Sequence, residues 1–133
     1  MLETLANMPD DVVGFVASGR VTRKDYEDVL IPKVESVLKT HDKVRFYYEL
    51  GSAFSGMEPG AMWEDAKVGI SHLRQWDRIA VVTDVEWIRI ALRAFGFAIP
   101  GDLRVFSNSE AAQARQWIVA RERPTDDASP PSP

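Results

Sequence analysis

One stretch of the sequence decides the fold: residues 60–106, GAMWEDAKVGISHLRQWDRIAVVTDVEWIRIALRAFGFAIPGDLRVF. Apolar residues recur at helical spacing over 60–76 and again over 85–95, while 78–83 and 103–106 are short, mainly apolar runs. Runs of that length are typical of buried strands. Strands that alternate with helices predict an α/β fold with a mostly parallel sheet and right-handed crossovers.

The residues before this stretch extend the same sheet. Segments 2–8 and 12–20 are apolar enough to form strands, and the turn signal at 9–11 between them predicts an N-terminal hairpin. A helix is expected over 22–40. Pro32 lies inside it and removes one backbone hydrogen bond, so we expect a bend there.

The strand expected over 43–50 has two different faces, because alternate residues of a strand point to opposite sides. One face has Val44, Phe46, Tyr48 and Leu50, and the other has Arg45, Tyr47 and Glu49. A strand buried on both faces does not normally carry Arg and Glu. One face of the sheet is therefore expected to be thinly covered here, or covered by a partner. The following segment, 51–60, contains three glycines and a proline and is expected to be a loop.

The C-terminal part adds one more helix and a tail. Ser109 is expected to cap a final helix that runs to about residue 121. Residues 122–133 are rich in Pro, Ser and Asp without apolar periodicity, which predicts disorder. We therefore expect a single domain over 1–121, with about four helices, followed by a disordered tail over 122–133.

The composition excludes several classes of function. The chain has 133 residues, no cysteine and a formal charge of −4, of which residues 122–133 contribute −2 (three acidic residues and one arginine). A near-neutral body lacks the basic surface that nucleic-acid binding requires. Without cysteine there is no disulfide or thiolate metal site, as suits the cytoplasm. Because the N-terminus lacks a signal-peptide pattern and no apolar run is long enough to span a membrane, we expect a cytoplasmic protein.

Two segments of the sequence resemble a known family. They are residues 11–50, DVVGFVASGRVTRKDYEDVLIPKVESVLKTHDKVRFYYEL, and residues 60–89, GAMWEDAKVGISHLRQWDRIAVVTDVEWIR. Together they resemble the SpoIIAA-like family of small bacterial proteins, grouped with STAS (anti-anti-sigma factor) domains and more loosely with Sec14-type lipid-binding modules. The resemblance covers about residues 1–120. It implies a STAS-type fold with helices packed mainly on one face of the sheet.

The resemblance also brings a regulatory switch into question. In anti-anti-sigma factors, a phosphorylated serine lies at the N-terminus of the helix that follows the third strand. The matching residues here, 58–61 (EPGA), contain no serine, and Ser52 and Ser55 lie several positions upstream. We therefore do not expect a phosphorylation switch of that kind.

Catalytic motifs are absent from the sequence. The two histidines have no second histidine or carboxylate at metal-ligand spacing, so neither a metal site nor a cofactor is expected. Glu49 and Asp84 follow the ends of two adjacent expected strands, which is the usual ligand crevice of an open sheet. Either they belong to a ligand or partner site, or Asp84 caps a helix and Glu49 pairs with Arg45 or Arg78. A hydrolase-type enzyme site at the strand ends is the least favoured alternative.

Two helices carry more apolar residues than one core-facing stripe needs. On the 60–76 helix the apolar stripe comprises Trp63, Ala66, Ile70 and Leu73, and it is widened by Met62, Gly69 and Trp76. On the 85–95 helix the core stripe comprises Ile88, Ala91, Leu92 and Phe95, and a flank beside it comprises Trp87, Ile90 and Ala94. These faces either pack on the sheet as wide core faces or form an exposed patch for another subunit. A third alternative is an apolar pocket under the 51–60 loop. That pocket would be lined by Phe54, Met57, Met62 and Trp63, with Glu49 and Asp84 at the strand ends.

Two hypotheses of function follow. The first is a non-enzymatic, STAS-like regulatory or protein-interaction module that forms a homodimer through Trp87, Ile90 and Ala94 and binds a protein partner. The alternative is a binder of a small apolar or lipid-like ligand, by analogy with Sec14-type modules. An enclosed cavity near Trp63 would favour the second, and an exposed apolar surface would favour the first.

Overall fold

Five strands form one sheet whose spatial order follows the sequence, β1-β2-β3-β4-β5, in the computed structural model of the chain. The strands are β1 (Leu2–Thr4), β2 (Val12–Val21), β3 (Val44–Met57), β4 (Trp76–Thr83) and β5 (Asp102–Phe106). β1 is antiparallel to β2, and the other neighbours are parallel. The predicted hairpin and mostly parallel sheet are confirmed. The structure describes residues 1–96, 99 and 101–121, so the predicted disordered tail lies outside the described residues.

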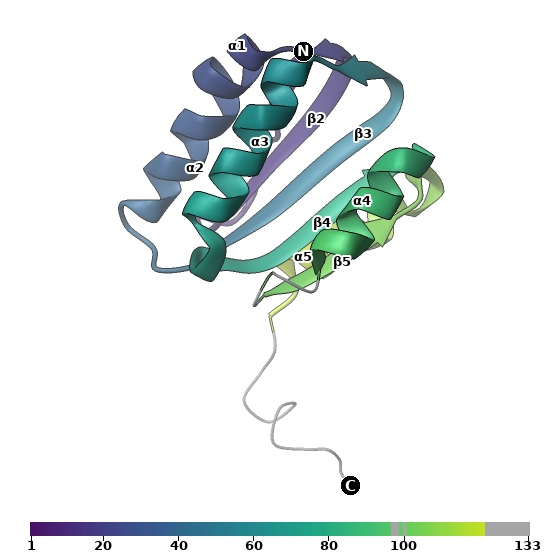
Figure 1. The fold of residues 1–133 in the computed structure, drawn as a ribbon. Helices are drawn as coiled ribbons and strands as arrows, with labels where there is room; N and C mark the ends of the chain where they lie inside the picture. Colours follow the sequence, from purple (N-terminus) through teal and green to yellow (C-terminus); the bar gives the residue numbers. More distant parts are fainter. Residues whose placement is uncertain (97–98, 100, 122–133) are drawn as a thin grey trace, which may run out of the picture.

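The helices cover the two faces of this sheet unequally. The helical elements are α1 (Arg23–Asp25), the π-helical turn η1 (Tyr26–Leu30), α2 (Ile31–Leu38), α3 (Pro59–Ser71), the 3-10 turn η2 (Leu73–Gln75), α4 (Glu86–Gly96), the 3-10 turn η3 (Asn108–Glu110) and α5 (Ala111–Val119). α2, α3 and α4 lie on one face, in front of the sheet in Figure 1, and α5 lies behind it. The expectation of helices mainly on one face is confirmed.

β3 shows why the two faces differ. Phe46 and Tyr48 belong to the larger core under α2, whereas Tyr47 belongs to a smaller core that Ala114 and Ile118 of α5 complete. The predicted alternation along this strand is therefore correct. On the α5 face, the buried Arg45 donates to the Ile118 carbonyl at 3.0 Å. A cation at the C-terminal end of a helix satisfies carbonyls that lack helical partners. Arg45, on the face that was expected to be thinly covered, therefore caps the end of α5.

A π-helical turn directly precedes α2, in whose first turn Pro32 lies and where a bend was expected. Thr22 and Asp25 make a reciprocal capping box that starts the helix. Downstream, the Ile31 amide reaches back five residues to the Tyr26 carbonyl, and Pro32 follows in the first turn of α2. A π turn inserts one extra residue. The helical segments thus run without a break from Arg23 past the proline to Leu38.

Two sequence-based boundaries were wrong because tertiary pairing overrides composition. The segment 51–60 is mostly strand, not loop: β3 continues to Met57, which pairs with Val21 of β2. The pairing tolerates the glycines by shifting register around Gly19. At the other end, Ser107 caps the final helical segment in a box with Glu110, in place of Ser109.

Gly101 is required where β5 begins, because a Cβ there would lie 2.3 Å from the Trp76 carbonyl oxygen. We expect Gly101→Ala to lower the free energy of unfolding by about 1–3 kcal/mol, as overpacking does. Gly69→Ala is the matched control, since a Cβ there meets nothing within 4 Å. In a helix interior that change should be neutral or stabilising by up to about 1 kcal/mol. Urea unfolding measures both, and equal effects would contradict the argument.

Candidate functional site

The orientation of α3 is the feature on which the candidate site depends. Helical spacing puts Ala61 and Glu64 on one side of α3, and both are buried. The opposite side carries Met62, Trp63 and Ile70, whose exposed fractions are 44%, 62% and 71%. The apolar stripe therefore faces solvent, and the small and acidic residues face the protein. Of the alternatives drawn from the sequence, the wide core face does not apply to this helix.

Glu64 attaches the first half of α3 to α1. Its Oε2 atom lies 3.6 Å from a guanidinium nitrogen of Arg23 and 3.3 Å from Nζ of Lys67. The Arg23 backbone amide also donates to the Glu58 carboxylate, at 3.1 Å. Gly60 permits the close approach, because a Cβ there would lie 3.1 Å from Cβ of Arg23. A nearly buried carboxylate with two cations nearby holds this end of the helix by charge.

A second carboxylate, Asp65, joins α3 to a buried pair of tyrosines. The Tyr26 hydroxyl lies 2.8 Å from Oδ1 of Asp65 and 3.0 Å from the hydroxyl of Tyr48. Tyr26 has one proton, which the carboxylate accepts, so the other contact uses the Tyr48 proton. Burial raises the pKa of both tyrosines well above the usual value. Desolvation also raises the pKa of Asp65, against the effect of the Tyr26 hydrogen bond. Since Asp65 keeps solvent contact, we expect that rise to be smaller than full burial would give.

Trp76 fixes the other end of α3. The sequence placed it on the helix, but it is the first residue of β4 and is buried. Its indole nitrogen donates to the Gly69 carbonyl at 3.1 Å. The prediction failed because the 3-10 turn of η2 ends the helical spacing just before this residue. Trp76 thus contributes nothing to the apolar stripe of α3.

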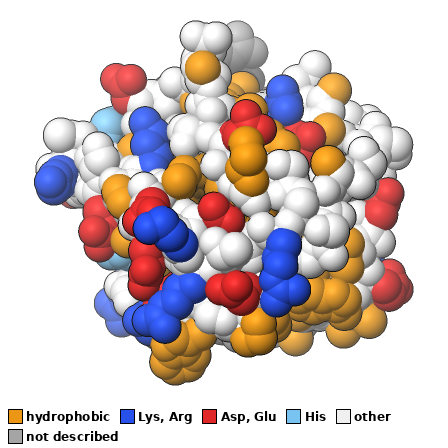
Figure 2. All heavy atoms as spheres, turned by 90° about the horizontal axis from the view of Figure 1, so that it is seen from above, with side chains coloured by type: hydrophobic (Ala, Val, Ile, Leu, Met, Phe, Trp, Pro, Cys, Tyr) orange, Lys and Arg blue, Asp and Glu red, His pale blue; other side chains and the backbone are white. Residues whose placement is uncertain are grey.

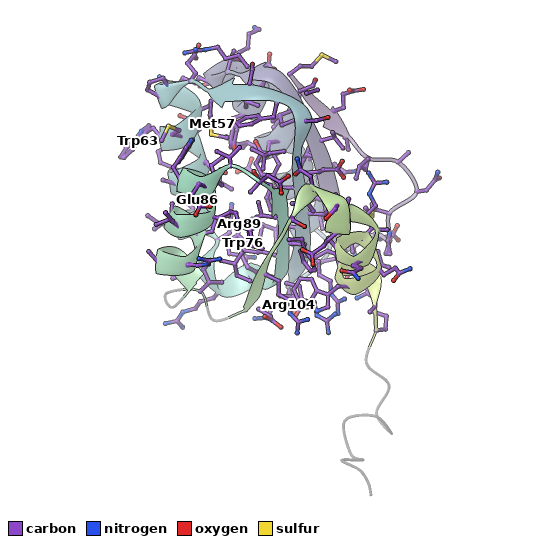
Figure 3. All side chains as sticks on the ribbon, turned by 90° about the vertical axis from the view of Figure 1, so that its right-hand side faces the viewer. Met57, Trp63, Trp76, Glu86, Arg89 and Arg104 are labelled. Atoms are coloured by element: carbon purple, nitrogen blue, oxygen red, sulfur yellow. The ribbon has the colours of Figure 1, made fainter. Side chains whose placement is uncertain are left out.

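α4 adds a second apolar ridge on the same side of the sheet. Ile88 is buried, as predicted, while Trp87 and Ile90 are 50% and 57% exposed and Ala94 is exposed. Figure 2 shows hydrophobic side chains along the lower edge of the view, the side on which α3 and α4 lie. Figure 3 shows Trp63 pointing away from the body of the protein. Five of the six exposed large apolar side chains among the described residues lie on these two helices; the sixth is Met1.

The remaining predicted residues lie elsewhere. Phe54 and Met57 pack against the larger core from β3. Glu49 is on the α5 side, where it accepts from the Tyr47 hydroxyl at 2.5 Å and from Arg115 at 3.0 Å. Its expected partners, Arg45 and Arg78, were therefore wrong. The reason is that α5, whose position the sequence could not supply, brings Arg115 to the end of β3.

Asp84 accepts from the Asn108 backbone amide at 3.0 Å, so it ties the end of β4 to η3. Glu49 and Asp84 thus share the α5 side at the strand ends, away from Met62 and Trp63. Burial and the hydrogen bond to Glu49 raise the pKa of Tyr47 to about 12. Every contact described at these two carboxylates is structural.

Neither a metal site nor a membrane-spanning helix is found in the described part of the chain. No group of three or more His, Cys, Asp or Glu side chains could hold a metal ion among residues 1–96, 99 and 101–121. Over the same residues, no helix is both long and apolar enough to cross a membrane. The candidate site is therefore the apolar outer surface of α3 and α4, which we call the α3–α4 face: Met62, Trp63, Ile70, Trp87, Ile90 and Ala94.

The tyrosine pair predicts a non-additive response to mutation. Tyr26→Phe removes the hydroxyl that both Tyr48 and Asp65 contact, and should lower the free energy of unfolding by about 1–3 kcal/mol. The double variant Tyr26→Phe/Tyr48→Phe leaves no unpaired tyrosine hydroxyl, so it should cost less than the sum of the single variants. Urea unfolding of all four proteins measures the coupling. Additive losses would show that the tyrosines do not act as a pair.

Comparison with known proteins agrees with this architecture. The SpoIIAA-like family model matches residues 12–119. No curated protein matches the chain. A solved structure from Shewanella loihica, an uncharacterised DUF3478-family protein with a SpoIIAA-like fold, is 24% identical and superposes with a TM-score of 0.70. The superposition covers 88% of this chain and 93% of that one, and at this identity it supports the fold alone. With the family model spanning most of its length, this chain belongs to the SpoIIAA-like family.

Proposed function

We propose that the protein is a non-enzymatic interaction module that forms a homodimer through the α3–α4 face. The observation that carries the proposal is the outward orientation of α3, which leaves Trp63 and Ile70 in solvent on the same face of the sheet as Trp87 and Ile90 of α4. Burying a side chain of this size contributes about 1.5–3 kcal/mol. A face with five such side chains therefore has a strong tendency to associate.

The size of the face fits a subunit contact. Large apolar side chains present roughly 150–250 Å² each when fully exposed, so the five exposed fractions amount to roughly 600 Å². That equals the largest apolar patch on a typical monomer, roughly 300–600 Å². It is also about three quarters of the ~800 Å² that each partner buries in a standard interface. Polar residues around the two ridges can supply the rest.

The charges beside the two ridges are compatible with a second copy. Asp65 and Lys67 flank the ridge of α3, while Glu86 precedes Trp87 on α4, and all three are exposed. The α3 ridge thus has both signs beside it. A two-fold arrangement that packs α3 of one subunit on α4 of the other can place opposite charges together at the rim.

The chemistry of the strand ends supports a non-enzymatic function. Glu49 is engaged with Tyr47 and Arg115, and Asp84 with the backbone of η3. The helix start that would carry a phosphoserine is Glu58 and Pro59. Ser52 and Ser55 lie in β3. We propose that binding here is controlled by the apolar face itself and not by phosphorylation at the start of α3.

The test is Trp87→Glu combined with Ile90→Lys, followed by light scattering from low to high micromolar concentration. Wild type should have twice the chain mass of 14.9 kDa, and the variant should have the chain mass. The control, Gln113→Glu with Gln116→Lys, makes the same charge changes at exposed positions of α5 and should remain a dimer. Because both mutated side chains are half exposed in the subunit, the monomeric variant should still unfold cooperatively, while the dimeric control gains the added stability of association.

Several outcomes would contradict the proposal. A wild type that stays monomeric at high micromolar concentration, or a double variant that stays dimeric, would exclude this interface. Native mass spectrometry of protein from its own host adds a further criterion. A monomer that retains an apolar or lipid-like molecule would favour the ligand-binding alternative instead.

A further inference from the structure

β5 leaves one edge of the sheet open. It pairs with β4 in regular register from Asp102 to Phe106, and among the described residues no other strand pairs with it. An edge strand presents unpaired backbone N–H and C=O groups, which can pair with an added strand. The opposite edge is shorter, because β1 has three residues. Beyond β1, the N-terminal ammonium donates hydrogen bonds to the Ser18 and Arg20 carbonyls of β2.

β5 has two of the usual protections of an edge strand, short length and charged residues, but it lacks two others. It contains no proline and no bulge in its pairing with β4. Its two charged residues form an ion pair at 3.6 Å, Arg104 with Asp102, and the Arg104 guanidinium lies 4.6 Å from the Trp117 ring of α5. Alternation along the strand puts these charges on the α5 side. The α4 side of the edge therefore remains available to a partner.

A hollow of about 570 Å³ lies between α4 and this edge. Its floor is apolar, formed by Leu92 of α4 with Leu103 and Val105 of β5. Arg89 and Arg93 line it from α4, and Asp102 of β5, whose carboxylate pairs with Arg104, lines it as well. Arg89 is oriented by a hydrogen bond of 2.8 Å to the Thr83 carbonyl, while Arg93 is exposed. Figure 3 shows Arg89 on this side of the protein.

We propose that the β5 edge and this hollow bind an extended, acidic segment of a partner protein as a sixth strand. Backbone hydrogen bonds to β5 would supply affinity, and alternate side chains would supply specificity. Side chains toward α4 would be apolar over Leu92, Leu103 and Val105 and acidic where they reach Arg89 and Arg93. A second copy of this chain fits poorly, because pairing two β5 edges brings the arginines of both copies together.

This surface is distinct from the α3–α4 face. Helical spacing places Trp87 and Ile90 on one side of α4, whereas Arg89, Leu92 and Arg93 lie on the side toward β5. A dimer formed through the first surface therefore leaves the second open. The two proposals can fail independently.

The probe is a blocked, fluorescently labelled peptide, Gly-Val-Thr-Glu-Thr-Val-Thr-Glu-Gly, whose valine and glutamate side chains share one face of the added strand. It is titrated against the full chain and followed by anisotropy. We expect saturable binding, with protection of the β5 amides from hydrogen exchange. Lysine in place of both glutamates should weaken binding at least about tenfold, because like charges placed together cost more than the ~1.4 kcal/mol of a tenfold change. A scrambled peptide, Gly-Val-Glu-Thr-Thr-Val-Glu-Thr-Gly, puts the glutamates on the face opposite the valines and should also bind at least about tenfold more weakly.

Matched variants identify the site. Arg93→Glu should weaken binding of the acidic peptide at least about tenfold. Lys39→Glu makes the same charge change at an exposed residue after α2 and should leave the binding affinity unchanged. Trp87→Glu with Ile90→Lys should leave peptide binding unchanged whether or not it dissociates a dimer. The proposal is overturned if the acidic peptide does not saturate or the lysine peptide binds as tightly. Equal effects of the two charge reversals, or amide protection confined to α3, would overturn it as well.

Discussion

Two carboxylates of α3, the buried Glu64 and the exposed Asp65, constrain the rest of the structure through their contacts. Glu64 between Arg23 and Lys67, and Asp65 on the Tyr26 hydroxyl, fix which side of the helix meets the protein. A carboxylate taken out of water needs such charged partners; Lys67 belongs to α3 itself, whereas Arg23 of α1 and Tyr26 of η1 link the helix to the rest of the protein. Once those contacts form, Trp63 and Ile70 face solvent, because helical spacing puts them on the side of α3 opposite Ala61 and Glu64. The apolar surface of α3 is thus a consequence of the polar contacts that join the helix to α1 and η1.

The α3–α4 face lies outside the buried cores of the protein. The sheet, α2, α5 and Ile88 of α4 supply the buried cores, so the exposed ridges on α3 and α4 are not needed to complete them. Residues that a fold does not require, yet that expose large apolar side chains together, are typical of an interface. On the other side of α4, the arginines beside β5 give the protein a second surface of different chemistry.

The sequence was sufficient for the fold but only partly for the site. Local patterns predicted the parallel strands, the hairpin and the two faces of β3, because these depend on short-range alternation. Hydrophobic spacing also identified the residues of the α3 stripe, but it could not give the direction in which the stripe points. That direction depends on Tyr26 and Asp65, which are 39 residues apart. In the sequence, Glu64 and Asp65 near Ala61 indicated a polar inner side of this helix. The larger number of apolar residues on its other side favoured the opposite orientation. The partner of Glu49, likewise, depends on where α5 packs.

The absence of cysteine from the chain permits a direct measurement of this orientation by thiol labelling. Ile70→Cys and Ala61→Cys are introduced separately into the Trp87→Glu/Ile90→Lys background, where the proposed subunit contact is removed. The Ile70→Cys variant should react with a thiol reagent nearly as fast as unfolded chain, because Ile70 is 71% exposed. The Ala61→Cys variant should react at least about tenfold more slowly, since labelling must wait for local opening. Rapid labelling of Ala61→Cys with protection of Ile70→Cys would mean that α3 packs its apolar stripe on the sheet, which would contradict this account.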